Sequence, residues 1–190
     1  MKTENLERYL NSFGKEVVKD ARRNLNKAKG NTSLASTIKS KVVDKGDGFA
    51  VQFTMADYGT FVDKGVKGAG GVIKTGKHKG SWGGRRWFTT WKGKRKDSPY
   101  KFGSGKGKGS IYKGISDFIK KKGIKGRNQI TGRFITNKSL TFAIVKVLWI
   151  KGIHGISFFQ KSLYDNYFKG DFGDNLLKAL KQDILDNITQ

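Results

Sequence analysis

The 190-residue chain has no cysteine, a single proline and only two histidines. Without cysteine it has neither a disulfide framework nor a thiolate metal site. His78 and His154 cannot by themselves assemble the Cys/His ligand sets of zinc sites, so we expect no metal and no other cofactor. Acidic side chains are also scarce, 15 against 39 lysines and arginines, and the net charge is +24.

Long apolar runs are missing as well. The N-terminal MKTENLERYL has no apolar core of the kind that secretory signals contain. The most apolar stretch, residues 134–156, is interrupted by Lys138, Lys146 and Lys151, so we expect no bilayer span and no membrane partner. These features predict a soluble protein of the cytoplasm, or of an assembly built there.

The positive charge is concentrated in the middle of the chain. Residues 64–127 hold 20 basic and two acidic side chains, whereas residues 1–63 and 128–190 each have a net charge of +3. The Lys/Gly runs in the middle bury little apolar surface to offset the cost of ordering the backbone. The chain therefore consists of two ordinary globular flanks and a physically distinct centre.

The spacing of apolar residues predicts the fold class. Three- and four-residue steps over residues 4–29 predict a long amphipathic helix. Alternation over residues 38–43 and 49–55 predicts a β-hairpin with one buried face. Helical spacing recurs further on, at residues 111–122, 139–150 (as a buried helix) and 174–188. We expect an α+β fold, with a small antiparallel sheet packed against the long N-terminal helix and the C-terminal helices.

The same elements suggest the domain organisation. We predict one α+β domain made of residues 1–65 and 111–190. Residues 66–110 are then a long, basic, Gly/Lys-rich and partly flexible insertion in that domain.

Motifs for catalysis are absent. Glycine-rich phosphate loops have the spacing G-x-x-x-x-G-K-[ST] or G-x-G-x-x-G. Neither occurs, even within GSGKGKGS at residues 103–110. Asp57 and Asp63 are the only acidic pair of interest, and they flank an aromatic-glycine segment that favours a loop or interface role. His78 lies in a Lys/Gly run typical of a solvated residue, and His154 has no candidate nucleophile nearby. We expect no enzyme activity.

The basic insertion is the strongest chemical signal. Lysine and arginine displace condensed counterions from a polyphosphate, which favours contact with nucleic acid of any sequence. Interleaved aromatic residues add surfaces on which bases or sugars stack. The candidate contact residues are Lys74, Lys77, Lys79, Arg85, Arg86, Lys92, Lys94, Arg95, Lys96, Lys106 and Lys108. A loop that is merely solubilised, an acidic protein partner or an anionic lipid surface would account for the same charge.

Four segments, in this order, resemble a family of tailed-bacteriophage neck and tail-completion proteins. Residues 31–38 (NTSLASTI) are similar to the family's Thr-Gly-x-Leu segment, although its glycine is missing. Residues 58–65 (YGTFVDKG) resemble Tyr-Ala-x-x-Val-Glu-x-Gly, with Asp63 in place of the Glu. Residues 139–153 resemble an apolar helix followed by Lys-Gly-Ile. Residues 155–163 resemble Pro-Phe-Leu/Phe-x-x-Ala-Leu, with Ser157 in place of the proline.

The resemblance implies a structural virion protein, located in the neck or tail and assembled in the host cytoplasm. Such proteins form a homomeric ring, of roughly six or twelve subunits, around a channel for double-stranded DNA. Their partners are the portal or adaptor, other neck proteins and tail proteins. Aromatic candidates for interfaces between subunits or partners are Tyr58, Phe61, Trp82, Trp87, Trp91, Phe158 and Phe159.

A second function class stays open. Composition alone favours a free, sequence-independent nucleic-acid-binding protein of the nucleoid- or ribosome-associated kind. The near-neutral flanks favour the ring protein, because a dedicated DNA binder usually carries its charge on the folded domain. A nuclease is disfavoured, since the basic region lacks clustered Asp, Glu and His for a metal.

Overall fold

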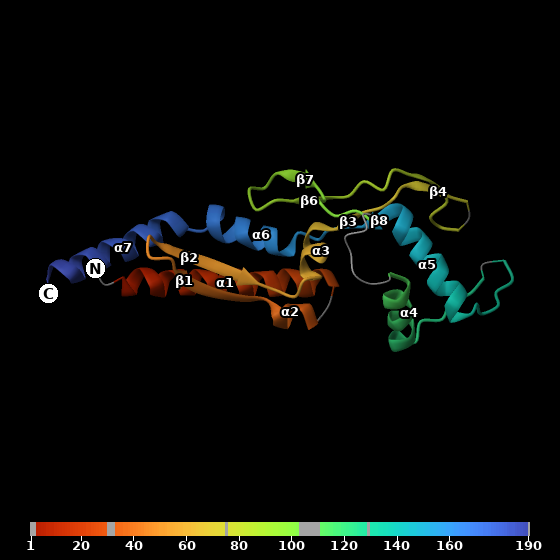
Figure 1. Ribbon diagram of the computed structural model, residues 1–190, viewed down its shortest axis with the longest axis horizontal. Coiled ribbons are helices and arrows are strands. Elements are labelled where there is room, and N and C mark those ends of the chain that lie inside the picture. The colour runs from red at the N-terminus through yellow and green to blue at the C-terminus, as the bar shows by residue number, and fades with distance from the viewer. Residues whose placement is uncertain (1–2, 30–32, 75, 103–110, 129, 190) are drawn as a thin grey trace. The chain divides into compact units, whose positions relative to one another are not determined.

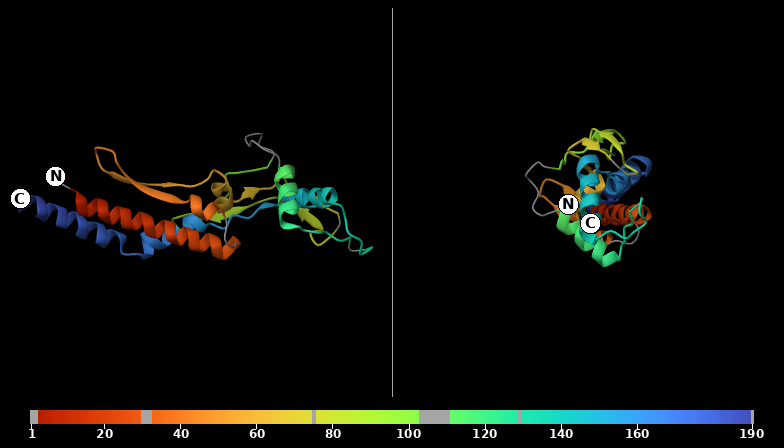
Figure 2. Two further views of the ribbon diagram at one scale, coloured as in Figure 1. Left: turned by 90° about the horizontal axis from the view of Figure 1, so that it is seen from below. Right: turned by 90° about the vertical axis from the view of Figure 1, so that its right-hand side faces the viewer.

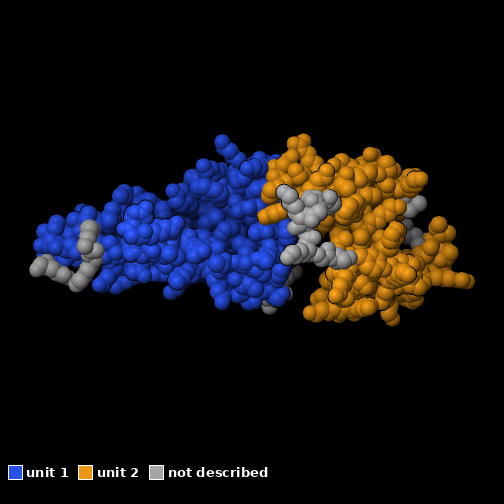
Figure 3. All heavy atoms as spheres, viewed as in Figure 1, with its two compact units in different colours: residues 1–64, 88–96, 155–190 blue, residues 65–87, 97–154 orange. Residues whose placement is uncertain are grey.

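The computed structural model describes residues 3–29, 33–74, 76–102, 111–128 and 130–189 (Figure 1). The chain forms two compact units, which Figure 3 distinguishes by colour. Unit 1 consists of residues 1–64, 88–96 and 155–190, and unit 2 of residues 65–87 and 97–154.

These boundaries differ from those predicted. Residues 111–154, expected in the main domain, belong to unit 2 together with most of the predicted insertion. Residues 88–96 of that insertion belong to unit 1 instead. The division follows tertiary contacts between segments far apart in the sequence, which the local charge pattern does not report.

Unit 1 is built around one long helix. Helix α1 (Glu4–Lys29) covers the predicted range and buries one stripe of apolar residues, as its periodicity indicates. The core cluster joins Val18, Ala21 and Leu25 of α1 to Leu34, Ala35, Ile38 and Phe158. Leu34 and Ala35 come from the short helix α2 (Ser33–Thr37).

Helices from the C-terminal segment complete unit 1. Helix α6 (Phe158–Tyr164) continues into a π-helical turn, η1 (Asp165–Lys169), and is followed by α7 (Phe172–Ile188). Helix α7 lies alongside α1 in the opposite direction, so that α1 begins and α7 ends at the same end of the unit (Figures 1 and 2). The Phe172 ring at the start of α7 contacts both Tyr9 and Phe13.

The predicted hairpin is confirmed. Strands β1 (Lys39–Asp44) and β2 (Phe49–Thr54) pair antiparallel, from Lys39 opposite Thr54 to Asp44 opposite Phe49. Gly46 adopts a φ of 82° in the connecting turn, where Asp44 Oδ1 accepts its N–H at 2.8 Å. A positive φ of this kind favours glycine, which explains the turn. The hairpin leads to the short helix α3 (Gly59–Lys64).

Unit 2 combines two helices with short strands. Helix α4 (Ile111–Lys122) contacts α5 (Asn137–Lys151). Strand β3 (Val66–Lys67) pairs antiparallel with β8 (Gly152–Ile153), and β4 (Gly71–Ile73) pairs antiparallel with β5 (Gly80–Trp82). Strands β6 (Trp87–Thr89) and β7 (Arg95–Asp97) form a further pair, of which residues 88–96 belong to unit 1.

The α+β class is as predicted. Within the described residues the strands form four separate two-stranded sheets, three of them antiparallel by their register. Among the described strands, β1 and β2 are the ones that pack on α1 in the way expected of the sheet. The strands within residues 66–102 give part of the predicted insertion regular structure, whereas its run from 103 to 109 lies outside the described residues.

In two helices most of the apolar face, which the sequence periodicity predicts to be buried, is exposed or half-buried. In α5, expected to be buried, only Thr141 and Ile150 are fully buried and Phe142 is 63% exposed. In α7 the stripe that includes Leu177 and Ile188 is largely exposed, while Asp183 is buried. Both helices therefore expose apolar side chains.

Candidate functional site

The most unusual property of the structure is the charge of unit 2. Its 81 residues contain 19 lysines and arginines but only two acidic residues, Asp97 and Asp117. Unit 1 holds 20 basic and 13 acidic residues in 109 positions. Two carboxylates cannot neutralise nineteen cations, so unit 2 carries a strong positive field. Nine of these nineteen cations come from the predicted insertion, residues 66–110, and ten come from residues 111–154.

The expected nucleic-acid contacts fall in different parts of the chain. Lys74, Lys77 and Lys79 follow β4 or lie in the turn before β5, and all three are exposed. Arg85 and Arg86 also belong to unit 2. The segment 88–96, which belongs to unit 1, holds four others: Lys92, Lys94, Arg95 and Lys96. The last two, Lys106 and Lys108, lie outside the described residues.

The two adjacent arginines differ in their availability. Arg85 is exposed and forms an ion pair with Asp97, with 3.1 Å between Nε and Oδ2. Arg86 is half-buried, and its Nη1 donates to the carbonyl of Arg85 at 2.9 Å. Its Nε is buried with no hydrogen-bond partner among the described residues. Arg85 is therefore the better placed of the two for an external phosphate.

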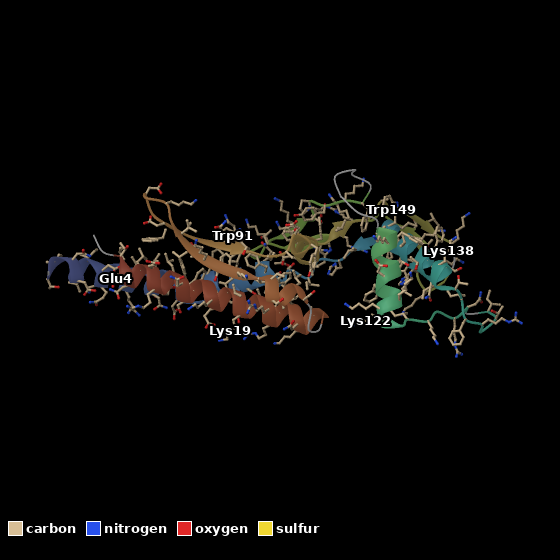
Figure 4. The ribbon with its side chains drawn as sticks, turned by 60° about the horizontal axis from the view of Figure 1, so that its bottom comes forward. Glu4, Lys19, Trp91, Lys122, Lys138 and Trp149 are labelled. Atoms are coloured by element: carbon tan, nitrogen blue, oxygen red, sulfur yellow. The ribbon has the colours of Figure 1, made fainter. Side chains whose placement is uncertain are left out.

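Helices α4 and α5 add cations that the sequence analysis did not select. Figure 4 shows nitrogen-tipped side chains projecting from unit 2, with Lys122 of α4 and Lys138 of α5 labelled. The connecting segment adds Arg127, whose guanidinium lies 4.5 Å from the centre of the exposed Phe134 ring. The signal was present, since residues 111–154 contain ten basic residues and one acidic residue. This run extends from the basic middle of the chain, residues 64–127, into residues 128–190, whose net charge is only +3.

A compact cation–aromatic cluster links α5 to the β4–β5 hairpin. Lys151 Nζ lies 3.5 Å from the centre of the Trp82 ring and 3.2 Å from Nδ1 of His78. The Trp82 indole N–H donates to the carbonyl of His78 at 3.0 Å. His78 is thus half-buried in a specific contact, and its prediction as a solvated residue is wrong.

The predicted aromatic interface residues have different environments. Tyr58 and Trp91 are exposed, and Phe61 lies 41% exposed on α3. Trp82 packs as described above, and Trp87 contacts His154 edge-on with ring centres 5.3 Å apart. Phe158 is 1% exposed and belongs to the core of unit 1, so its prediction as an interface residue is corrected. Phe159 packs against the same core and contacts Phe53.

Trp91 is part of an aromatic cluster in unit 1. It stacks on Phe168 with 5.7 Å between ring centres, and it contacts Tyr167 edge-on at 5.9 Å. Lys92 Nζ lies 5.1 Å from the Trp91 ring centre. Tyr167 and Phe168 are exposed and project from the π-helical turn η1, a type of turn that often occurs at functional sites. An exposed aromatic surface flanked by lysine suits a protein interface or stacking on a ligand ring.

Asp63 is a structural residue of unit 1. Its side chain is 2% exposed, and Oδ1 accepts the backbone N–H of Phe159 in the first turn of α6 at 2.8 Å. Burial raises the pKa of the Asp63 carboxyl, against opposing hydrogen bonds from Phe159 and Gln160 and the charge of Lys64. The Asp63 side chain thus provides an acceptor for a free N–H group at the start of a helix, while its burial makes the charged form costly.

Signs of metal chemistry or membrane insertion are absent from the described part of the chain. There, no three His, Asp or Glu side chains come together in a way that would hold a metal ion. No helix in the same part is both long enough and apolar enough to cross a membrane.

Comparison with known proteins adds no assignment. No protein-family model, no curated protein sequence and no solved structure matches the chain.

Proposed function

We propose that the chain is a structural subunit of a tailed-phage neck, located in the virion. In this proposal copies of the chain form a closed ring that joins the portal or its adaptor to the tail. Unit 1 is the body of the subunit, and unit 2 supplies the positive charge around the DNA. The protein has no catalytic role in this assembly.

One observation carries the proposal: two of the four family-like segments are bonded to each other. The carbonyl oxygens of Val62 and Asp63 accept the N–H groups of Ile156 and Ser157 at 3.1 and 2.9 Å. The Asp63 side chain adds the bond to Phe159. Segments 58–65 and 155–163 thus form one structural motif, although about ninety residues separate them. Such a motif gives a physical reason for their joint occurrence.

The third family-like segment has a comparable role in unit 2. Its Lys-Gly-Ile run contains β8, which pairs with β3 through Val66 opposite Ile153. Gly152 has a φ of 80°, and a Cβ at this position would overlap the carbonyl oxygen of Val66. The glycine in the run is therefore required by the close approach of two strands.

The charge of unit 2 suits a DNA channel. A ring repeats each basic unit around its axis, so that a modest contribution per subunit becomes a strong field. Contacts to phosphates that do not read the bases weaken with salt and let DNA slide. Both properties are needed where a genome has to pass.

A second candidate is favoured by the charge count of unit 2. A folded unit with 19 basic and two acidic residues is also what a free, sequence-independent nucleic-acid-binding protein would carry. This observation weakens the argument that the charge lies outside the folded parts of the chain.

Light scattering at low and high salt, with electron micrographs of any large species, separates the two candidates. Closed rings that persist in high salt would support the neck subunit, because protein–protein contacts then hold the assembly. A monomer that becomes larger only when a DNA duplex is added would favour the free nucleic-acid-binding protein. A monomer that binds no DNA at low salt would count against the free nucleic-acid-binding protein.

A further inference from the structure

A groove in unit 1 carries a second concentration of positive charge. It has a volume of about 290 Å³ and lies between α1 and the start of β1. Four cationic side chains line it: Lys15, Lys19 and Arg22 from α1, and Lys39 from β1. We call it the α1–β1 groove. Of the candidate nucleic-acid contacts that the structure describes, none lies in it.

Helical geometry explains why the cations meet. Lys19 follows Lys15 by four residues and Arg22 follows Lys19 by three, spacings that place side chains on one face of a helix. Arg22 is held in place, since its Nη2 donates to the backbone carbonyl of Ile38 at 2.8 Å. Figure 4 labels Lys19 on this helix.

The groove has features of a binding site beyond its charge. Two apolar residues that line it, Val18 and Ile38, are 7% and 0% exposed and belong to the core of unit 1. A rigid core thus supports this part of the wall. Ser40 lines the groove as well and adds a hydroxyl group, which both donates and accepts hydrogen bonds.

Among the residues that the structure describes, no acidic side chain lines the groove. Glu16 pairs with Lys19 at 3.3 Å, but both side chains are more than half exposed. Exposed pairs of this kind contribute little to stability, so that a stronger anion can displace the carboxylate. Like charges spaced i, i+4 destabilise a helix, and a bound anion would remove that cost.

We propose that the α1–β1 groove binds phosphate groups. Ammonium groups, a guanidinium and a hydroxyl are the donors that phosphate oxygens accept in proteins. The phosphate is either part of a nucleic-acid backbone or part of a free phosphate compound. This proposal goes beyond the neck role, since it concerns unit 1 and does not depend on ring formation.

Lysine footprinting on the full-length protein tests the proposal. Acetylation of each lysine is measured by mass spectrometry without ligand, with a short DNA duplex and with sodium pyrophosphate, at physiological salt. We expect ligand to slow acetylation of Lys15, Lys19 and Lys39 several-fold. Lys178 and Lys181 of α7, in the same unit, serve as references that keep their rate. Light scattering on each sample verifies that the assembly state is unchanged.

The pattern of protection identifies the source of the phosphate. Protection by DNA alone assigns the groove to the nucleic-acid backbone, and protection by pyrophosphate alone assigns it to free phosphate compounds. Protection by both supports phosphate recognition in either form. Unchanged acetylation of all three lysines with both ligands would overturn the proposal. Lys74, Lys77 and Lys79 report separately on unit 2, so failure of the groove and failure of the DNA-channel role are distinguishable.

A pair of matched variants tests whether the groove acts as a unit. Lys15→Gln/Lys39→Gln removes two groove cations, and Lys178→Gln/Lys181→Gln removes the same charge elsewhere in unit 1. We expect the first variant to lose protection of Lys19 and the second to retain it. Equal protection of Lys19 in both variants would contradict a joint phosphate site.

Discussion

The carboxylate of Asp63 accepts the backbone N–H of Phe159 at 2.8 Å, and this bond connects the end of α3 to the first turn of α6. The two residues belong to segments 58–65 and 155–163, on which the proposed neck role rests. Asp63 is buried, so no water can replace its carboxylate as the acceptor of the Phe159 N–H. We therefore expect Asp63→Ala to reduce the free energy of unfolding by about 1–2 kcal/mol, measured by chemical denaturation.

Asp63→Asn tests the electrostatic cost of this carboxylate. Because burial raises the pKa of Asp63 above its ordinary value of 3.8, the folded state binds the proton more tightly than the unfolded state. The tighter binding of this proton thus stabilises the folded state fully below pH 3.8. This stabilisation is lost as the pH rises through the raised pKa of Asp63. Since Asn does not titrate, the melting temperature of Asp63→Asn relative to wild type should rise from acid to neutral pH. Asp57→Asn, which removes a carboxylate at an exposed site of the same unit, is the control. Parallel curves for wild type and Asp63→Asn would contradict the prediction.

Asp183 should show the opposite pH dependence. This α7 residue accepts the backbone N–H groups of Asn5 and Leu6 at 2.9 Å each and so caps α1. Burial opposes ionisation, but the bonds from Asn5 and Leu6 and the charge of Arg8 outweigh it, so that the pKa lies below its ordinary value of 3.8. The ionised Asp183 therefore stabilises the folded state fully above pH 3.8. This stabilisation is lost as the pH falls through the lowered pKa of Asp183.

Substitution of Asp183 by Asn leaves one good acceptor for two backbone donors. We expect a loss of about 1 kcal/mol at neutral pH, which shrinks on acidification below the ordinary pKa of the carboxyl. Thermal melting across pH measures it, with Asp174→Asn on the same helix as the matched control. A loss that does not change with pH would show that the charge of Asp183 is not responsible.

The capping role of Asp183 explains why one face of α7 was predicted incorrectly. Periodicity locates an apolar stripe, here the one with Leu177 and Ile188, but does not identify the element that covers it. The face of α7 that meets α1 includes Asp183 because the free N–H groups at the start of α1 need an acceptor. The range of α1 was predictable, since its 26 residues combine one apolar stripe with acidic residues in the first turn.

The charge of unit 2 was predictable from the sequence, but its boundaries were not. Its charge is a property of the sequence, and the prediction of a basic segment rested on it. Its boundary depends on the pairing of Val66 with Ile153, which are 87 positions apart, and no local pattern reports such a pairing. The groove lysines were missed for the same reason, because Lys15 and Lys39 come together only in the folded unit 1.

Two glycines of unit 2 provide a matched test of its backbone. Gly152→Ala would place a Cβ against the backbone of Val66 and 2.5 Å from the nitrogen of Gly68, at a φ of 80°. We expect a loss of at least about 2 kcal/mol. Gly114→Ala in α4 meets no atom within 4 Å and should gain about 0.5–1 kcal/mol. Tryptophan fluorescence follows the melting, since Trp82, Trp87 and Trp149 lie in unit 2. Equal stability of the two variants would refute the close β3–β8 contact.

Excision of unit 2 tests whether unit 1 is an independent domain. All residues of the core cluster belong to unit 1. The bonds from Ile156 and Ser157 to the carbonyls of Val62 and Asp63 keep Lys64 and Gly155 close enough for a short Gly/Ser linker to replace residues 65–154. Because its core is intact, we expect this protein to unfold cooperatively in a thermal melt.

The same excision also removes residues 88–96, which unit 1 uses. Phe88 is 5% exposed, and the N–H groups of Thr89 and Trp91 donate to the side chains of Ser157 and Gln160 at 2.9 and 3.0 Å. A second version that keeps 88–96 between two short linkers should therefore be more stable, by about 3 kcal/mol or more. If neither version melts cooperatively, unit 1 is not a domain that folds alone. If the two melt at the same temperature, residues 88–96 do not contribute to its stability, and the β6–β7 hairpin belongs to unit 2.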